Sequence, residues 1–186
     1  MNDSAATSAR VAAPGDPWLE RRVDELLLRL PPAAGAPILI ERVAELRDQH
    51  GTAHAGSFLR ERRITVACTR DEFPRVFAHE WFHFVWLRAG NPLRRDFERL
   101  LAAERQAGAR GELGWSAEWR KRLLTQQDVR ERSRRWREYC CESFCDTAAW
   151  MYAGLEGHAE FTLAARFRRR RQAWFTQNVS GKQLSI

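Results

Sequence analysis

An apolar stretch over residues 76–86 carries three ionisable side chains, His79, Glu80 and His83, and this combination constrains the fold more than any other feature. Histidines four residues apart project from the same side of a helix, one turn from each other. Two imidazoles on an otherwise apolar helix need polar partners or an ion, because a buried polar group without a partner costs free energy. The rest of the chain must therefore fold so that other segments supply these partners.

The five residues 79–83 read His-Glu-Trp-Phe-His and match the H-E-x-x-H motif. Imidazoles at this spacing can bind one zinc ion at about 2.0–2.1 Å. The carboxylate of Glu80, next to the first histidine, can reach a water molecule on the zinc without binding the zinc itself. The motif therefore predicts a zinc-dependent hydrolase. The alternative is a buried structural helix whose histidines hydrogen-bond to the backbone.

A zinc site of this kind needs a third protein ligand, and a later acidic stripe offers candidates. Glu138, Glu142 and Asp146 are spaced four residues apart, so on a helix they share one face. The residues around Glu142 and Asp146 are increasingly apolar, which is unusual for a solvated acidic face. We therefore expect this face to be buried against the helix of the two histidines.

These residues resemble the gluzincins, the H-E-x-x-H peptidases whose third zinc ligand is a glutamate on a later helix. Their second motif is Glu-x-x-x-Asp, and the segment Glu142-Ser-Phe-Cys-Asp146, closely followed by two alanines, matches it. A predicted hairpin before the motif helix is also similar to this group, particularly to minimal members such as the ImmA/IrrE-like metallopeptidases. The resemblance covers about residues 56–154, with 59 residues from His83 to Glu142, more than in thermolysin-type or minimal members.

The resemblance implies a zinc peptidase with a Zn²⁺ cofactor and a peptide or protein substrate. Zinc in such a site lowers the pKa of a bound water and polarises the scissile carbonyl. The resemblance implies that His79, His83 and Glu142 are the zinc ligands. It also implies that Glu80 is the general base. Asp146 is then expected to hold a ligand histidine in its binding orientation.

Some of these roles have alternatives. Glu138 is the alternative third ligand, with Glu142 supporting it. Asp146 would alternatively form an ion pair with an arginine. Cys141 and Cys145 lie near Glu142 in the sequence, but catalytic gluzincin sites use a carboxylate, so we do not expect a thiolate ligand.

Gluzincins normally add a tyrosine, histidine or arginine that stabilises the oxyanion. The candidates in this chain are His54, Tyr152 and His158, and the sequence does not choose among them. His54 precedes a predicted edge strand, where an extended peptide substrate could add by β-pairing.

The first part of the chain mixes strand and helix patterns. Residues 1–15 are rich in Ala, Ser, Gly and Pro, and we expect them to be disordered. A helix is predicted over 18–30, and a strand over 38–46, although the latter pattern also fits a helix. The segments 57–59 and 63–68 flank a polar turn and predict a hairpin.

From residue 74 onward the apolar pattern is helical. Helices are expected over about 72–88, 91–107, 116–124, 127–152 and 158–175. We therefore predict an α+β protein, mostly helical, with a small antiparallel sheet packed on the motif helix. In line with the length of 186 residues, we expect one zincin-like metallopeptidase domain over 16–186 that includes the C-terminal helices.

The chain is basic, with a formal net charge of +7 and a pI of about 10.0. Arginine accounts for 29 of the 31 basic residues, since only Lys121 and Lys182 are lysine. Most arginines alternate with acidic residues along the predicted helices, as on solvated faces, and we expect the same of the run Arg168–Arg171. Nucleic-acid binding through arginine-rich helices is therefore a weaker alternative function.

No segment approaches the roughly 18 consecutive apolar residues of a membrane helix, and the N-terminus lacks the apolar core of a secretory signal. We expect a cytoplasmic protein whose four cysteines are thiols. The main alternative to a free-standing peptidase is a regulatory protein on a peptidase-like scaffold, with a regulatory protein partner. ImmA/IrrE-like proteins act in transcriptional control in this way, by cleaving or engaging a repressor.

Overall fold

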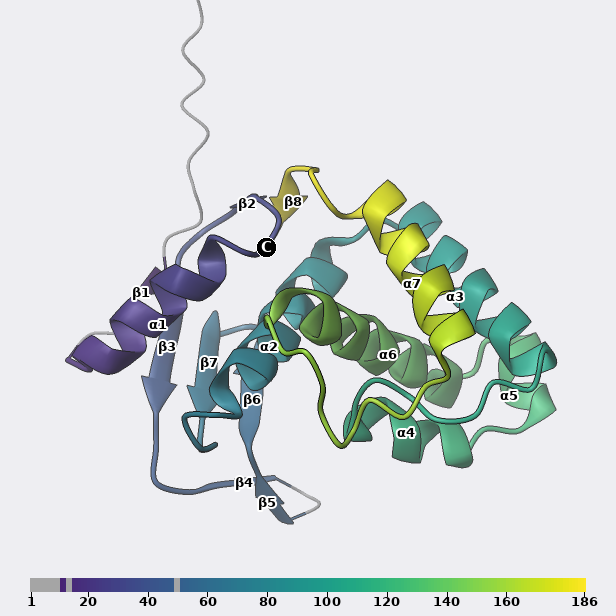
Figure 1. Ribbon diagram of the computed structural model, residues 1–186, viewed down its shortest axis with the longest axis horizontal. Coiled ribbons are helices and arrows are strands. Elements are labelled where there is room, and N and C mark those ends of the chain that lie inside the picture. The colour runs from purple at the N-terminus through teal and green to yellow at the C-terminus, as the bar shows by residue number, and fades with distance from the viewer. Residues whose placement is uncertain (1–10, 13–14, 49–50) are drawn as a thin grey trace, which may run out of the picture.

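The computed structural model describes residues 11–12, 15–48 and 51–186, so residues 1–10 and 13–14, for which the sequence predicts disorder, lie outside the described residues. The protein has the predicted α+β fold, with a small sheet at one end and helices at the other (Figure 1). None of the helices in the described ranges is long and apolar enough to cross a lipid bilayer.

Four strands form the main sheet in the order β1 (Val11–Ala12), β3 (Ile38–Arg42), β7 (Arg63–Val66) and β6 (Ala55–Phe58). β6 and β7 form the predicted antiparallel hairpin. β3 pairs in parallel with β7 and β1 in parallel with β3, so the sheet is mixed rather than antiparallel as predicted. After β3 the chain forms a separate hairpin of β4 (Leu46–Asp48) and β5 (Gly51–Ala53). It then enters the sheet at the edge as β6 and turns back as β7, which lies between β6 and β3.

One face of this sheet is apolar and belongs to the main core. Its inward side chains are each at most 1% exposed: Ile38, Ile40, Ile64 and Val66. Helix α1 (Pro17–Leu27) contributes an apolar stripe to the same core. The helix starts where Asp16 accepts a hydrogen bond from the Leu19 N–H at 3.1 Å, and its proline occupies the first helical position.

The motif helix α2 (Phe73–Arg88) packs between the sheet and helix α6 (Arg134–Tyr152) (Figure 1). Trp81 and Phe82, the two bulky residues inside the motif, are buried at 1% and 0% exposure and belong to the core. They therefore do not obstruct the side of α2 that carries the histidines. The contact between α2 and α6 places the two sequence motifs side by side.

The helix predicted over 127–152 is in fact two helices, α5 (Gln126–Glu131) and α6. Between them Arg132 adopts a left-handed backbone conformation with a φ of 49°. Ser133 then caps α6 by accepting a hydrogen bond from the Trp136 N–H. Helical periodicity does not reveal this break, because the residues on both sides of it fit a helix.

The remaining helices are α3 (Asn91–Gln106), α4 (Trp115–Arg122) and α7 (Ala165–Asn178). Helices α3, α4 and α5 lie between the two motifs in the chain and account for their long separation. Helix α7 begins later than the predicted residue 158, because the Thr162 and Leu163 N–H groups donate to the Glu112 carbonyl and hold this segment as a loop.

The last strand of the chain pairs with a strand from its N-terminal part. Strand β8 (Leu184–Ser185) pairs in parallel with β2 (Ala33–Ala34), the segment that follows α1. In Figure 1 this pair lies above the sheet and ties the last helix to the N-terminal part.

Arg171, at the end of the arginine run, is fully buried, which corrects the prediction that the whole run is solvated. Its guanidinium group lies 2.8 Å from Glu104 and 2.7 Å from Glu112, both of them buried. The Tyr139 hydroxyl donates a hydrogen bond to Glu112 at 2.6 Å. This network joins α7, α3, α6 and the segment before α4. The other three arginines of the run are exposed or partly exposed.

Candidate metal centre

Two histidines of α2 and a glutamate of α6 bring three donor atoms together. The Nε2 atom of His79 lies 3.1 Å from Nε2 of His83 and 3.3 Å from Oε2 of Glu142. The Nε2 atom of His83 lies 3.9 Å from the same carboxylate oxygen. Because the donor atoms of all three residues lie within 4.8 Å of one another, a single metal ion could contact them together.

Asp146, one turn after Glu142, connects His79 to helix α4. Its Oδ1 lies 2.7 Å from Nδ1 of His79, and its Oδ2 accepts a hydrogen bond from the Ala117 N–H at 3.1 Å. When Nδ1 donates its proton to this carboxylate, the imidazole lone pair is on Nε2, which faces the other donor atoms. Gly114 allows this close approach, because a Cβ there would lie 2.2 Å from the Asp146 carboxyl carbon.

The surroundings of the two imidazoles favour a positive charge between them. Burial disfavours the charged form of His79, but the Asp146 carboxylate outweighs it and raises the pKa of His79 well above its ordinary value. The pKa of His83 is raised to about 9, against the effect of burial, chiefly by Cys141. Burial also opposes the charge of Glu142, yet the two histidines lower its pKa to about 2. A cation between these groups, whether a proton or a metal ion, is therefore well stabilised.

Strand β6 holds the carboxylate of Glu80. The Ser57 hydroxyl lies 2.5 Å from Oε2 of Glu80 and 2.9 Å from its carbonyl oxygen, so it can donate to either. Ser57 thereby restricts the orientation of the carboxylate through one of its two oxygens. The sequence carries no signal for this contact, because a single serine in a strand is unremarkable.

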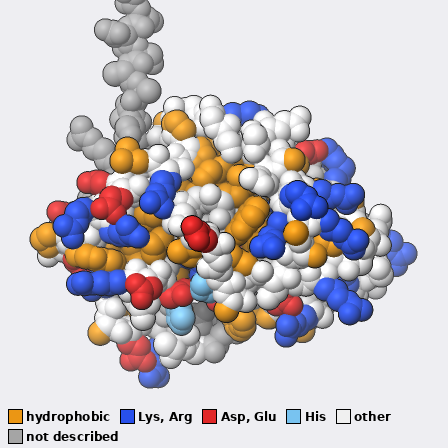
Figure 2. All heavy atoms as spheres, in the orientation of Figure 1, with side chains coloured by type: hydrophobic (Ala, Val, Ile, Leu, Met, Phe, Trp, Pro, Cys, Tyr) orange, Lys and Arg blue, Asp and Glu red, His pale blue; other side chains and the backbone are white. Residues whose placement is uncertain are grey.

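A cavity of about 660 Å³ opens beside these residues, and His79, Glu80 and Asp146 form part of its wall. On the face shown in Figure 2, histidine side chains reach the surface beside acidic ones. Three other parts of the chain also line it: the segment Thr52–Ala55 before and at the start of β6, the α4 residues Trp115, Ser116, Trp119 and Arg120, and Glu160 in the loop before α7. Arg75 and Val76 of α2 complete the wall.

The three candidates for oxyanion stabilisation lie in different places. His54 lines the cavity. The Tyr152 hydroxyl forms a hydrogen bond with Ser180 at 2.8 Å, and Nε2 of His158 lies 2.9 Å from Glu72. Of the three, the geometry therefore favours His54.

Two further residues clarify the ligand set. Glu138, the alternative third ligand, forms an exposed ion pair with Arg134 at 2.6 Å and lies outside the donor cluster. Arg120, which was not predicted from the sequence, lines the cavity and has its guanidinium group 3.4 Å from Oε1 of Glu142. Arginines are too frequent in this chain for the sequence to single out one of them.

The other ring nitrogen of His83 faces two thiols of α6. The Sγ atom of Cys141 lies 3.5 Å from Nδ1 of His83, and Cys145 follows one turn later, fully buried. A hydrogen bond with Cys145, together with His83, lowers the pKa of Cys141 to about 6 against the effect of burial. His83, Cys141 and Cys145 thus form a second group of donor atoms within 4.8 Å of one another.

No protein-family model, no curated protein and no solved structure matches this chain. We therefore infer its function from the residues and geometry of the site.

Proposed function

We propose that the protein is a zinc-dependent hydrolase that cleaves peptide bonds, as the gluzincins it resembles do. The observation that carries this proposal is the convergence of three donor atoms from His79, His83 and Glu142 within 4.8 Å of one another. Two imidazole nitrogens and one carboxylate oxygen are a ligand set that catalytic zinc sites use, with a further position left for water or substrate.

The hydrogen bond of His79 supports zinc as the occupant. Metal-binding histidines usually donate their second ring N–H to a carboxylate or carbonyl group, which fixes the tautomer and the ring orientation. Asp146 occupies this place at 2.7 Å from Nδ1 of His79. A buried structural histidine would not need a second imidazole and a second carboxylate at its Nε2 atom.

The chain supplies the groups that move and hold protons. Zinc, when bound, would lower the pKa of a water molecule to near 7 and polarise a carbonyl group. Glu80 lines the cavity, and in the proposed reaction its carboxylate takes a proton from water and passes it to the leaving amine. Ser57 keeps this carboxylate oriented through its contact with Oε2.

The shape of the cavity wall supports an extended peptide as the substrate. β6 is the edge strand of the sheet, and its first residue, Ala55, lines the cavity. An extended peptide could pair with this edge and pass beside Glu80. Across the cavity, Trp115 is 63% exposed and offers an apolar surface to a substrate side chain.

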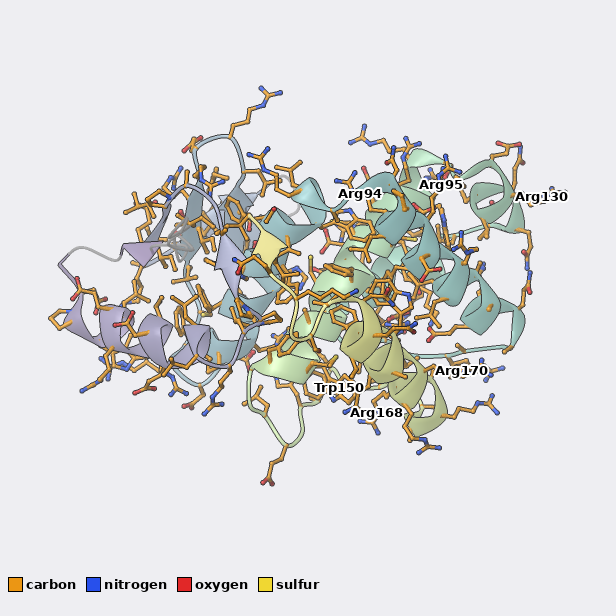
Figure 3. All side chains as sticks on the ribbon, turned by 90° about the horizontal axis from the view of Figure 1, so that it is seen from above. Arg94, Arg95, Arg130, Trp150, Arg168 and Arg170 are labelled. Atoms are coloured by element: carbon orange, nitrogen blue, oxygen red, sulfur yellow. The ribbon has the colours of Figure 1, made fainter. Side chains whose placement is uncertain are left out.

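The arginines labelled in Figure 3 do not form the single basic face that is typical of a nucleic-acid interface. In Figure 3 the labelled arginines project from different helices and in different directions: Arg94 and Arg95 from α3, Arg130 from α5, and Arg168 and Arg170 from α7.

The test is a comparison of zinc content and peptide hydrolysis between the wild type and Glu80→Gln. Glu80→Gln should keep its zinc and lose about 10²- to 10⁴-fold in hydrolysis rate, the usual contribution of a general base. The control is Glu138→Gln, at an exposed position of α6, which should change neither property. Full hydrolysis by Glu80→Gln would contradict the role of this residue. Stoichiometric zinc without hydrolysis of any peptide, together with a co-purifying protein, would support the regulatory alternative instead.

A further inference from the structure

His83 has a donor group at each of its two ring nitrogens. Its Nε2 atom faces Nε2 of His79 at 3.1 Å, within the candidate zinc cluster. Its Nδ1 atom faces Sγ of Cys141 at 3.5 Å, with Cys145 one helical turn further along α6. The three donor atoms on this second side also lie within 4.8 Å of one another.

We propose that His83, Cys141 and Cys145 form a second metal site, which binds a thiophilic divalent cation. Two sulfurs and one imidazole nitrogen are soft or borderline ligands, and such a set prefers zinc-group and other thiophilic ions over magnesium or calcium. Two thiolates neutralise a divalent cation, so the complex carries no net charge from these groups. This neutrality suits the surroundings, because Cys145 is 0% exposed and a buried net charge would be costly.

Two of the three residues of the second site are partly exposed. Cys141 is partly exposed, and the His83 side chain is 16% exposed. A cation can therefore contact Cys141 and His83 first and then the buried Cys145. Cys140, also on α6, is fully buried and does not belong to either donor group.

Because the two sites share His83, binding at one opposes binding at the other. A neutral imidazole carries a proton on one ring nitrogen and a lone pair on the other. When Nδ1 of a neutral His83 binds a cation, the proton is on Nε2, which faces Nε2 of His79 at 3.1 Å, and zinc can bind at Nε2 only if this proton leaves. A thiophilic cation at the second site therefore weakens zinc binding at the first, and by reciprocity zinc weakens the second. This inhibitory consequence rests on the proposed function, whereas binding at the thiols does not.

The direct test adds Cd²⁺ to the metal-free protein and measures the ultraviolet charge-transfer absorption of cadmium thiolates. The wild type should show this absorption, and Cys141→Ser/Cys145→Ser should lose it. The matched control is Cys68→Ser/Cys140→Ser, which removes the other two of the four cysteines and should keep the absorption. The single variant Cys141→Ser, changed at the partly exposed position, should lose at least half of it, which covers the case in which the double variant does not fold.

A second measurement separates this proposal from the proposed function. His79→Ala removes a ligand of the first cluster only, so it should lose zinc-dependent hydrolysis and keep the cadmium-thiolate absorption. In the wild type, bound Cd²⁺ should weaken zinc binding by about 5- to 150-fold, the usual range of coupling between two sites, and Cys141→Ser/Cys145→Ser should abolish this effect. Undiminished absorption in Cys141→Ser, or its loss in Cys68→Ser/Cys140→Ser, would overturn the second site.

Discussion

The carboxylate of Asp146 lies 2.7 Å from Nδ1 of His79 and holds this imidazole with its other nitrogen facing Glu142. The second oxygen of the same carboxylate accepts a hydrogen bond from Ala117, near the start of α4. A single side chain thus fixes both a proposed zinc ligand and the helix that forms one wall of the cavity.

Asp146→Asn tests the first of these two roles. Asparagine keeps the size of the side chain but removes the charge that favours a proton on Nδ1 of His79. Zinc should therefore bind about 10- to 100-fold more weakly, as is usual when the partner of a metal-binding histidine is lost. Competition with a chromophoric chelator measures the affinity. Asp24→Asn, at an exposed position of α1, is the control, and equal affinities in Asp146→Asn and the wild type would refute the role.

Gly114→Ala tests the close packing of α4 on Asp146. The new Cβ would lie 2.2 Å from the carboxyl carbon and must displace it. We expect a loss of about 1–3 kcal/mol in the free energy of unfolding, typical of overpacking, and weaker zinc binding because His79 loses its partner. Gly157→Ala is the control, since a Cβ there meets no atom within 4 Å. Chemical denaturation and chelator competition give the two quantities, and an unchanged zinc affinity in Gly114→Ala would argue against the link.

Ser57→Ala tests whether the orientation of Glu80 affects catalysis without affecting zinc binding. The hydroxyl lies 2.5 Å from Oε2 and 2.9 Å from the carbonyl oxygen of Glu80, which is not one of the proposed ligands. Its loss should lower kcat for peptide hydrolysis by up to about 100-fold, as expected for a misplaced catalytic group, while the zinc content stays unchanged. The exposed Ser185→Ala serves as the control. If zinc is lost together with activity, Ser57 supports the fold of the site rather than the base.

The buried network around Arg171 should make stability depend on acid pH. Burial opposes the charge of Glu112, but Arg171 and Lys121 lower its pKa to about 2, below the ordinary 4.5. The folded state thus binds this proton less readily than the unfolded state, so the stabilisation is complete above pH 4.5 and is lost as the pH falls from about 4.5 to 2. The pKa of Glu104 is raised, mainly by burial, so its protonation favours the folded state as the pH falls toward 4.5, before the loss from Glu112 begins.

Glu112→Gln is the variant that checks this pH dependence. This substitution should lower the free energy of unfolding by about 3–5 kcal/mol at neutral pH, because the buried Arg171 would keep its charge and lose one of its charged partners. Its free energy of unfolding should also decline less steeply between pH 4.5 and 2 than that of the wild type. Urea titrations across this pH range measure both effects. Identical acid profiles for the two proteins would show that Glu112 does not carry the dependence.

The sequence predicted those parts of the fold that local pattern determines. The helix expected over 72–88 is α2 (Phe73–Arg88), and the expected hairpin is β6 and β7. The parallel pairing of β3 with β7 and the break at Arg132 were not predicted. Strand order depends on contacts between distant segments, and the break depends on a single residue in a left-handed conformation within a helical pattern.

The same division holds for the site. His79 and His83 are brought together by helix geometry alone. Of the predicted acidic stripe, Glu142 and Asp146 lie among apolar neighbours and face the histidines, whereas Glu138 is exposed. Ser57 contacts Glu80, and Arg120 lies beside Glu142, only because segments distant in the sequence pack together. The spacing of residues in the sequence does not predict such contacts. For these residues only the structure reveals their place.

The most direct test of the proposed zinc site is the zinc content of the Cys141→Ser/Cys145→Ser protein, which keeps His79, His83 and Glu142 but loses the other donor group found among the described residues. After zinc loading and removal of excess metal, we predict one zinc ion per chain. The same protein with Glu138→Ala should keep this zinc, and with Glu142→Ala should lose it. Absence of bound zinc, or zinc retained unchanged when Glu142 is replaced, would contradict the account.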